Sequence, residues 1–266
     1  MKGTLALTVV ILAVPTAAVV LIACKKDTPV ALAESASALS AALPPASAKV
    51  VPYDVDPASK TSIDMPGVKE HITADTTAAA GHLDVDLMNL ANSRGEVKVD
   101  LTTLSTHTFH DEHDESQTSH ARNWLQVGDV AKPDEKKQFQ YAVFALQSLT
   151  GISSADVSKV AATKEGSEDV RTVTATVHGD FLVHGHKAAK DVPVEVKFHY
   201  PSGAAADSKP TKIDIKSTSP LKVTLKEHDV HPRDAVGNIA NWTTSLVSKV
   251  AETADITLDL HATLKN

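Results

Sequence analysis

Histidine and carboxylate side chains, both of which bind metal ions, gather in one short stretch of the chain. In residues 106–120 three histidines recur at intervals of three and a fourth follows: His107, His110, His113 and His120. Four carboxylates, Asp111, Glu112, Asp114 and Glu115, lie among them. Imidazole and carboxylate suit zinc, copper or nickel, and a helix would bring residues three apart near one face. The alternative, which we favour, is a solvated acidic loop in which histidine is frequent.

Sequence signatures of catalysis are absent. There is no Gly-x-Ser-x-Gly elbow and no His-Glu-x-x-His zinc motif. Asp84, Asp86 and Asp259 fall on the polar faces of predicted strands, where charge is expected. His184 and His186 flank Gly185 and are interpreted as turn residues of a hairpin, not as ligands. We therefore expect a protein that is not an enzyme and requires no cofactor.

Cys24 is the only cysteine of the chain, and it follows an uncharged, apolar segment that runs from Thr4 to Ala23 behind Lys2. A positive start, an apolar middle and small residues at the cut are typical of a signal peptide. The run from Leu21 to Cys24 resembles the lipobox of bacterial lipoproteins. The resemblance implies a diacylglycerol on the thiol, cleavage before Cys24 and acylation of the new amino group, with palmitate-type chains. We predict a signal peptide at residues 1–23.

The alternative for the same segment is a transmembrane anchor, because about 20 apolar residues can span a bilayer. Lys25 and Lys26 directly follow the segment, where the positive-inside bias favours the opposite orientation. A lone cysteine in an exported protein has no partner for an internal disulfide bond, and lipidation accounts for its presence. Several acyl chains anchor a protein stably. By resemblance to the lipoprotein sorting pattern, Lys25 in place of Asp favours the periplasmic face of the outer membrane.

Residues 24–50 are rich in Ala, Ser and Pro and contain no aromatic residue, which is typical of a flexible tether. Residues 51–266 are long enough for one domain with its own core. The net charge of the chain is −7, and it becomes −8 once Lys2 leaves with the signal peptide. An acidic domain repels phosphate backbones, so we expect no nucleic acid partner.

Alternation of apolar and polar residues dominates the domain. Each alternating segment predicts a strand with one buried and one solvated face, as in antiparallel sheets. The predicted strands cover residues 82–87, 96–101, 192–200, 212–216, 222–226 and 256–262. Gly, Pro, Asn and Asp lie between them, which favours a sandwich or an antiparallel barrel.

Other segments of the domain follow different patterns. Residues 139–149 are almost continuously apolar, as in a strand buried on both faces or a buried helix. Residues 119–127 predict a short helix with Ser119 as its N-cap. Residues 235–251 predict a helix on the sheet, because apolar residues recur there at intervals of three and four (Ile239, Trp242, Leu246 and Val250). Residues 106–118 and 202–209 are expected to be long polar loops.

The order of these pieces carries a resemblance to a known family. The pieces are the opening at residues 53–59, glycine-led strands at 81–87 and 95–106, a short helix at 122–125, a hairpin at 179–198 and a last strand at 255–262. In this order they resemble the YceI family, bacterial secreted proteins with a lipocalin-like barrel. The chain departs from the family at Leu182 and His186, where threonines are usual, and in its low aromatic content of 4%.

The resemblance implies an all-β fold, an antiparallel lipocalin-like barrel of about eight strands with one or two short helices. In that family the interior holds a long isoprenoid chain, so an isoprenoid quinone or polyprenyl lipid is the expected partner. Barrels of this size can hold one ligand, and burial of apolar surface contributes roughly 25 cal/mol per Å². The candidate lining residues are Leu83, Val85, Val97, Val99, Phe139, Tyr141, Val173, Val194, Val196, Phe198, Ile213, Ile215, Val223 and Leu225.

Three functions stay open at this point. The first is a lipid-anchored envelope protein that binds or carries an isoprenoid-type lipid. The second is a metal-binding envelope protein that uses the four histidines of residues 107–120. The third is a structural or interaction lipoprotein whose inward apolar residues form a packed core without a ligand. The oligomeric state is left open.

Overall fold

The computed structural model describes residues 50–67, 71–205, 207–234, 237–238 and 251–265. All of these residues belong to one compact unit, Ala33–Asn266. The predicted signal peptide, Cys24 and residues 24–49 of the predicted tether lie outside the described residues, as do Ile239, Trp242, Leu246 and Val250 of the predicted C-terminal helix. Within the described part of the chain, no helix has the length and apolar character needed to cross a membrane.

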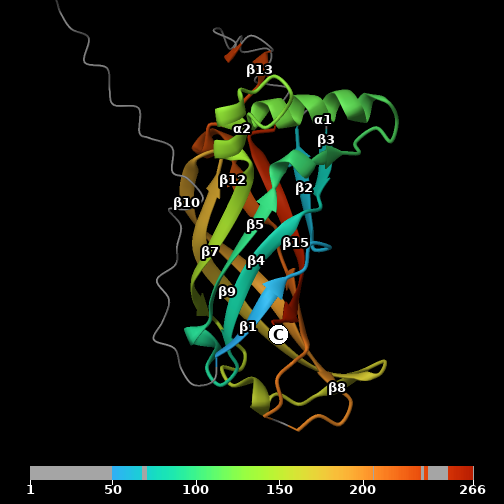
Figure 1. Ribbon diagram of the computed structural model, residues 1–266, viewed down its shortest axis with the longest axis vertical. Coiled ribbons are helices and arrows are strands. Elements are labelled where there is room, and N and C mark those ends of the chain that lie inside the picture. Colours follow the sequence, from blue (N-terminus) through green and yellow to red (C-terminus); the bar gives the residue numbers. More distant parts are fainter. Residues whose placement is uncertain (1–49, 68–70, 206, 235–236, 239–250, 266) are drawn as a thin grey trace, which may run out of the picture. The chain divides into compact units, whose positions relative to one another are not determined.

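Eight antiparallel strands close into a ring of hydrogen bonds (Figure 1). The ring runs β1 (Val50–Val55), β4 (Ala79–Asp86), β5 (Arg94–Asp100), β7 (Tyr141–Thr150), β9 (Glu168–Val183), β10 (His186–Pro201), β11 (Lys212–Ser217) and β15 (Thr253–Leu264), and β15 pairs with β1 again. Closure removes the free sheet edges that an open sheet would expose. The predicted all-β, antiparallel barrel of about eight strands is confirmed.

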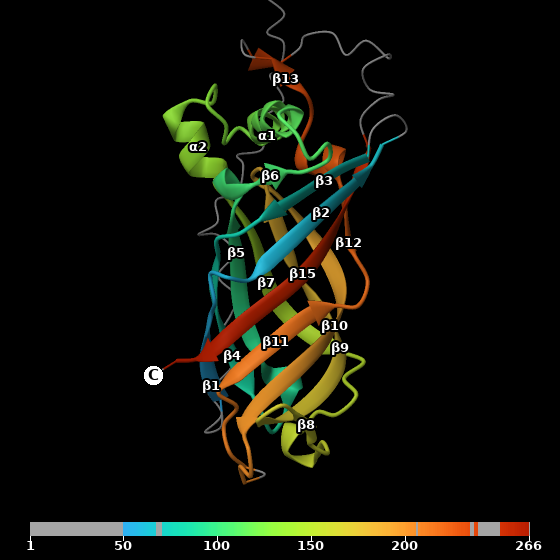
Figure 2. The same cartoon turned by 90° about the vertical axis from the view of Figure 1, so that its right-hand side faces the viewer.

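The long strand β15 extends the barrel toward one end (Figure 2). Its C-terminal half pairs with β1 and β11, and its N-terminal half pairs with β2 (Lys60–Pro66) and β12 (Leu221–Thr224). β2 continues to β3 (His71–Thr76) and β6 (Ser105–Thr106). The short strand β8 (Thr163–Glu165) pairs with β9, while β13 (Arg233–Asp234) and β14 (Gly237–Asn238) form a separate pair.

The β9–β10 hairpin is the largest element of the sheet, with 16 residues in each strand. Val192, Val194 and Phe198 are buried at alternate positions of β10, as the period-two pattern predicts. Two residues, His184 and Gly185, form the turn with φ values of 50° and 74°. Positive φ at both turn positions matches the right-handed twist of the paired strands. The hairpin therefore places His184 and His186 together at one end of the barrel.

Two helices, α1 (His113–Trp124) and α2 (Pro133–Phe139), lie at that same end of the barrel in both views (Figures 1 and 2). The prediction that Ser119 caps a helix is wrong, because α1 begins six residues earlier and Ser119 lies inside it. Asp114 and Glu115 occupy the first turn of α1, where carboxylates interact favourably with the helix dipole. Part of the expected polar loop at residues 106–118 is therefore helical.

The apolar segment 139–149, for which a strand or a helix was expected, contains the end of a helix and most of a strand. Phe139 ends α2, and β7 begins at Tyr141. Single-turn 3₁₀ helices join other elements of the described chain: η2 (Leu90–Asn92), η3 (Leu101–Thr103), η4 (Val157–Lys159) and η5 (Leu225–His228).

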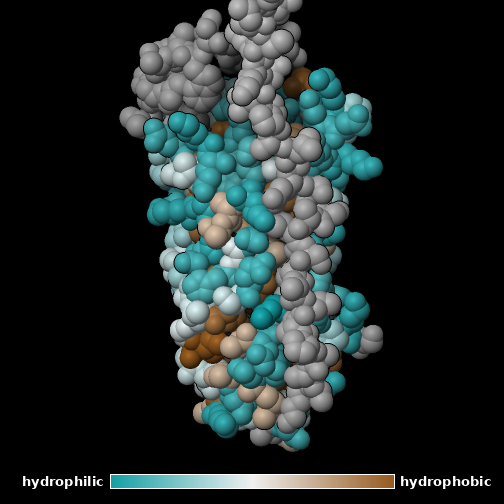
Figure 3. All heavy atoms as spheres, turned by 90° about the vertical axis from the view of Figure 1, so that its left-hand side faces the viewer, coloured by the Kyte–Doolittle hydropathy of each residue, from teal (hydrophilic) through white to brown (hydrophobic). Residues whose placement is uncertain are grey.

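Buried apolar side chains form two main clusters inside the barrel. One includes Tyr53 of β1, Val157 of η4 and Phe198 of β10. The other includes Leu125, which follows α1, and Leu221 of β12. On the outer face shown in Figure 3, hydrophilic residues dominate the described surface and apolar residues form small patches. On this face the alternation of the strands thus separates an apolar interior from a largely polar surface.

Candidate functional site

The interior of the barrel contains a cavity of about 270 Å³. Its wall consists mainly of Val, Leu, Ile, Phe and Ala side chains, most of them from the ring strands and the rest from β2, β3, β12, the helices and the connecting segments. A water molecule needs two to four polar partners to be stable in such a space, and apolar cavities stay dry. The cavity is therefore suited to an apolar ligand.

Twelve of the fourteen predicted lining residues lie on the cavity wall. They are Leu83, Val85, Val97, Val99, Val173, Val194, Val196, Phe198, Ile213, Ile215, Val223 and Leu225. Members of both buried clusters take part, so the cavity connects the two ends of the barrel interior. Leu225 contributes from η5 rather than from a strand.

The other two predicted residues, Phe139 and Tyr141, lie off the cavity wall. Phe139 ends α2, and its ring lies against His184 with centroids 4.3 Å apart. Tyr141 packs with Val143, Ala145 and Leu182, and Lys98 Nζ lies 5.3 Å from its ring centroid. The two residues lie on either side of the helix-to-strand junction at Gln140, which the almost continuous apolar run of residues 139–149 does not mark.

Several lining residues were missed by the sequence reasoning. Ile63 and Met65 of β2 line the wall, and the alternation of Thr61, Ile63 and Met65 is a signal that could have revealed them. Ala121 and Trp124 of α1 close the helix-covered end of the cavity. A helix that covers the end of a barrel leaves no period-two signal, so these two residues could not have been found in that way.

The cavity wall has few polar groups. Among the described lining residues Arg94 is the only charged one, and its Nη1 donates to the Ser93 carbonyl oxygen at 2.6 Å. Thr61 and Thr76 are cross-strand partners on β2 and β3, and both line the cavity. Among the described residues neither hydroxyl has a hydrogen-bond partner, although both are buried. A buried hydroxyl without a hydrogen-bond partner is destabilising. These two hydroxyls are therefore unusual polar groups on an otherwise apolar wall.

Two buried tyrosines, Tyr53 of β1 and Tyr200 of β10, belong to the cluster that includes Val157 and Phe198. Burial raises the pKa of Tyr53 and of Tyr200, so both phenols stay neutral and act as hydrogen-bonding groups within an apolar cluster. The guanidinium carbon of Arg171 lies 4.6 Å from the ring centroid of Tyr200, a cation–π arrangement.

The four histidines of residues 107–120 do not converge on one point. His107 Nε2 lies 3.1 Å from Asp75 Oδ2, and His113 Nδ1 lies 2.8 Å from Asp111 Oδ1. The backbone N–H of His110 instead donates to Asp114. Within the described part of the chain, the one group of three side chains whose ligand atoms could share a metal ion is His184, His186 and Asp229. The structure therefore does not assemble the metal site considered for this segment.

Comparisons with known proteins find likenesses of fold only. No protein-family model and no curated protein matches the chain. A polyisoprenoid-binding domain from Saccharophagus degradans, implicated in plant cell wall breakdown, is 14% identical over 81% of this chain and 99% of its own, with a TM-score of 0.49. BcnA from Burkholderia cenocepacia is 16% identical over 79% of this chain and 100% of its own, with a TM-score of 0.49.

The Campylobacter jejuni YCEI protein is 12% identical over 73% of this chain and 85% of its own, with a TM-score of 0.37. The closed ring of strands in this chain, rather than these distant likenesses, establishes the barrel. The lipocalin-like architecture expected from the sequence is confirmed on that ground.

Proposed function

We propose that the protein is a lipid-anchored protein of the bacterial cell envelope that binds or carries an isoprenoid-type lipid inside its barrel. The observation that carries the proposal is the apolar cavity, whose described lining residues include one charged side chain, Arg94. A hydrocarbon chain gains free energy as it leaves water for such a wall, roughly 25 cal/mol for each Å² buried. An isoprenoid quinone or a polyprenyl lipid has such a chain.

The composition of the wall favours binding over catalysis. General acid–base and nucleophilic catalysis need titratable or nucleophilic side chains beside the reacting atoms. Apart from Arg94 and the hydroxyls of Thr61, Thr76 and Ser93, the cavity wall offers only hydrocarbon side chains, one indole ring and one thioether. A ligand held there would be stored or transferred without chemical change.

Native mass spectrometry of the full chain, extracted from its membrane in detergent, tests the proposal. We expect the protein to retain one lipid whose mass, after organic extraction, matches an isoprenoid quinone or a polyprenyl species. A protein that carries no lipid and takes up none from added isoprenoid quinone would contradict lipid binding. It would leave the third function, a structural lipoprotein with an unliganded core.

The proposed anchor rests on the sequence around Cys24, because residues 1–49 lie outside the described part of the chain. Labelled palmitate should enter the wild-type protein in bacterial cells and should not enter a Cys24→Ser variant. The mature protein should begin at Cys24, and membrane fractionation should place it in the outer membrane. Labelling of the serine variant, or a mature chain that keeps residues 1–23, would rule out lipidation at Cys24.

A further inference from the structure

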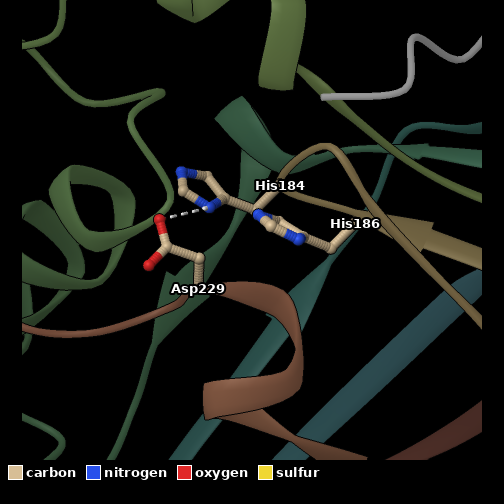
Figure 4. A group of neighbouring side chains, drawn as sticks. All are labelled: His184, His186 and Asp229. Atoms are coloured by element: carbon tan, nitrogen blue, oxygen red, sulfur yellow. Dashed lines mark ion pairs between the residues drawn. The ribbon is translucent and has the colours of Figure 1, made fainter. Parts of the chain in front are cut away.

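Three segments that are distant in the sequence meet at the helix-covered end of the barrel. His184 lies in the β9–β10 turn, His186 begins β10, and Asp229 follows η5 (Figure 4). Gln126, two residues beyond the end of α1, completes the group through its contact with His184. One ligand atom from each of His184, His186 and Asp229 lies within 4.8 Å of the others.

The ring of His184 faces oxygen atoms at both of its nitrogens. Nε2 lies 2.7 Å from Gln126 Oε1, and Nδ1 lies 3.1 Å from the carbonyl oxygen of His228 and 3.9 Å from Asp229 Oδ2. A neutral imidazole has a single N–H, so only one of its two nitrogens can donate a hydrogen bond to these oxygen atoms. The side chain is 2% exposed. A cation at Nδ1 would leave the Nε2–H free to donate to Gln126.

Metal-binding histidines combine a metal ion on one ring nitrogen with a hydrogen bond donated by the other. Such a histidine almost always donates its second N–H to a carboxylate or carbonyl oxygen, which fixes the tautomer and the ring orientation. Gln126 Oε1 occupies that place for His184. Gln126 lies 58 residues from His184 in the sequence, so the contact depends on the fold of the barrel end.

His186 and Asp229 can supply the remaining ligands, because both side chains are exposed and can change rotamer. The rings of His184 and His186 are stacked, with centroids 6.3 Å apart and an interplanar angle of 23°. In a tetrahedral zinc site with bonds of about 2.0 Å, ligand atoms lie roughly 3.3 Å apart. The ligand atoms of the three residues are now at most 4.8 Å apart. Rotation of the two exposed side chains would have to shorten that distance by about 1.5 Å to reach the zinc spacing.

The backbone of the cluster is held in an uncommon conformation. Gln126, His184 and Asp229 have φ values of 55°, 50° and 52°, and His110 is the only other described non-glycine residue with positive φ. This left-handed region is uncommon for residues other than glycine and is enriched at binding and active sites. Three independent chain segments adopt it where their side chains meet.

We propose that His184 Nδ1, His186 and Asp229 bind one divalent transition-metal ion of the zinc class, with Gln126 as the positioning residue for His184. Two imidazoles and one carboxylate are a ligand set that zinc accepts, and they leave a fourth position for water. His231 can reach that position, since its Nε2 lies 3.4 Å from Asp229 Oδ1. Val183 and Val230, each adjacent to a ligand residue, line the cavity, so the ion would join three segments at the cavity end.

Titration of the purified full chain with Zn²⁺ alone, by calorimetry and by competition with a chromophoric chelator, tests the site. We expect one tight equivalent in the wild type. His186→Gln and Asp229→Asn should each weaken zinc binding by about 100-fold, the upper end of what loss of a supporting group costs. Asparagine tolerates the left-handed conformation, so Asp229→Asn removes the carboxylate without straining the backbone.

Two further variants distinguish zinc binding at the proposed site from binding by the histidines of residues 107–120 and from nonspecific binding. A His110→Gln, His113→Gln, His120→Gln variant should keep the wild-type affinity. Gln126→Ala should weaken binding by about tenfold while leaving the ligands in place. Absence of tight binding, an affinity unchanged by Asp229→Asn, or a loss confined to the triple variant would each overturn the proposal. Circular dichroism of every variant checks that the barrel is intact.

Discussion

The hydroxyl of Tyr53 donates a 2.9 Å hydrogen bond to the carbonyl oxygen of Pro210, across 157 residues of sequence. Tyr53 is completely buried in β1, and Pro210, also buried, precedes β11. β1 and β11 both pair with β15, at the place where the first and last strands close the ring. The bond therefore links the two strands that flank the closing strand of the barrel.

Removal of that hydroxyl should destabilise the barrel. Tyr53→Phe leaves the ring in place and deprives the Pro210 carbonyl of its donor, so we expect the free energy of unfolding to fall by about 1–3 kcal/mol. Urea denaturation measures the change. Tyr141→Phe is the matched control, because Tyr141 is only partly buried and its hydroxyl forms no hydrogen bond between strands among the described residues. An equal loss in both variants would show that the Tyr53–Pro210 bond has no particular role in closure.

Gly81 of β4 should tolerate no side chain. Its φ is 149°, and an added Cβ would lie 2.0 Å from the carbonyl oxygen of Glu96 on β5. Gly81→Ala should therefore lower the free energy of unfolding by at least about 2 kcal/mol, through backbone strain and the forced separation of the two strands. Gly166→Ala isolates the strain, because Gly166 has φ of 61° and no atom within 4 Å of an added Cβ. We expect its cost to be about 1 kcal/mol, and thermal denaturation compares the two.

Thr76→Val should stabilise the unliganded protein. The Thr76 hydroxyl is buried without a partner, and valine has the same shape and suits a strand. We expect a gain of about 1 kcal/mol in the free energy of unfolding. Thr106→Val is the control, because the Thr106 hydroxyl donates to the Asp114 carbonyl oxygen at 2.8 Å, and its loss should destabilise. A loss of stability in Thr76→Val would mean that its hydroxyl has a partner in solution.

Asp214 on the outer face of β11 should make stability depend on acid pH. Burial raises the pKa of its carboxyl, but donation from His261 Nδ1 at 2.6 Å and the ammonium of Lys212 outweigh it, so the pKa is lowered overall. A carboxyl with a lowered pKa in the folded state stabilises that state above its unfolded pKa of about 3.9, and the contribution is lost as the pH falls through the folded value.

Asp214→Asn should accordingly lower the free energy of unfolding by about 1–3 kcal/mol at pH 7. The difference from the wild type should narrow as the pH falls below about 4. Urea denaturation from pH 7 to pH 3 follows both proteins. Asp129→Asn, at a fully exposed carboxylate, should differ from the wild type by less than about 0.5 kcal/mol throughout. A constant difference for Asp214→Asn would contradict the lowered pKa.

The strands were predictable because each carries its own signal. In β10 the alternation of Val192, Val194, Val196 and Phe198 determines which side faces inward, whatever the strand's neighbours are. The start of α1 was not predictable in this way. Its first turn contains only polar residues, and its stability comes from local contacts such as the Asp114 carboxylate with the backbone N–H of His110.

The residues of the candidate site also differ in how far a local sequence pattern predicts them. Strand residues such as Val97 and Ile215 were found by alternation, whereas Trp124 was missed because its place depends on how α1 packs over the barrel end. His184 was correctly assigned to a turn, but its burial and its contacts with Gln126 and His228 depend on segments far away in the sequence. Contacts of that kind follow from the closure of the ring, which no local pattern encodes.

Filling the cavity should abolish lipid binding while keeping the barrel. Ala175 of β9 lines the cavity, so the ring of an Ala175→Phe variant would occupy the space that the proposed isoprenoid chain needs. We expect native mass spectrometry to show no bound lipid. Because the new side chain fills empty space, the free energy of unfolding should stay within about 1.5 kcal/mol of the wild type. Ala142→Phe, on β7 at the same wall, provides an independent second variant.

The control is Ala189→Phe, which places the same ring on an exposed position of β10. It should retain the lipid at the wild-type level, because an outward side chain does not enter the cavity. Retention of lipid by both Ala175→Phe and Ala142→Phe, with circular dichroism showing intact barrels, would exclude the cavity as the binding site. Loss of lipid from those two variants alone would place the isoprenoid chain against β7 and β9, since only a ligand in the interior competes with a side chain there.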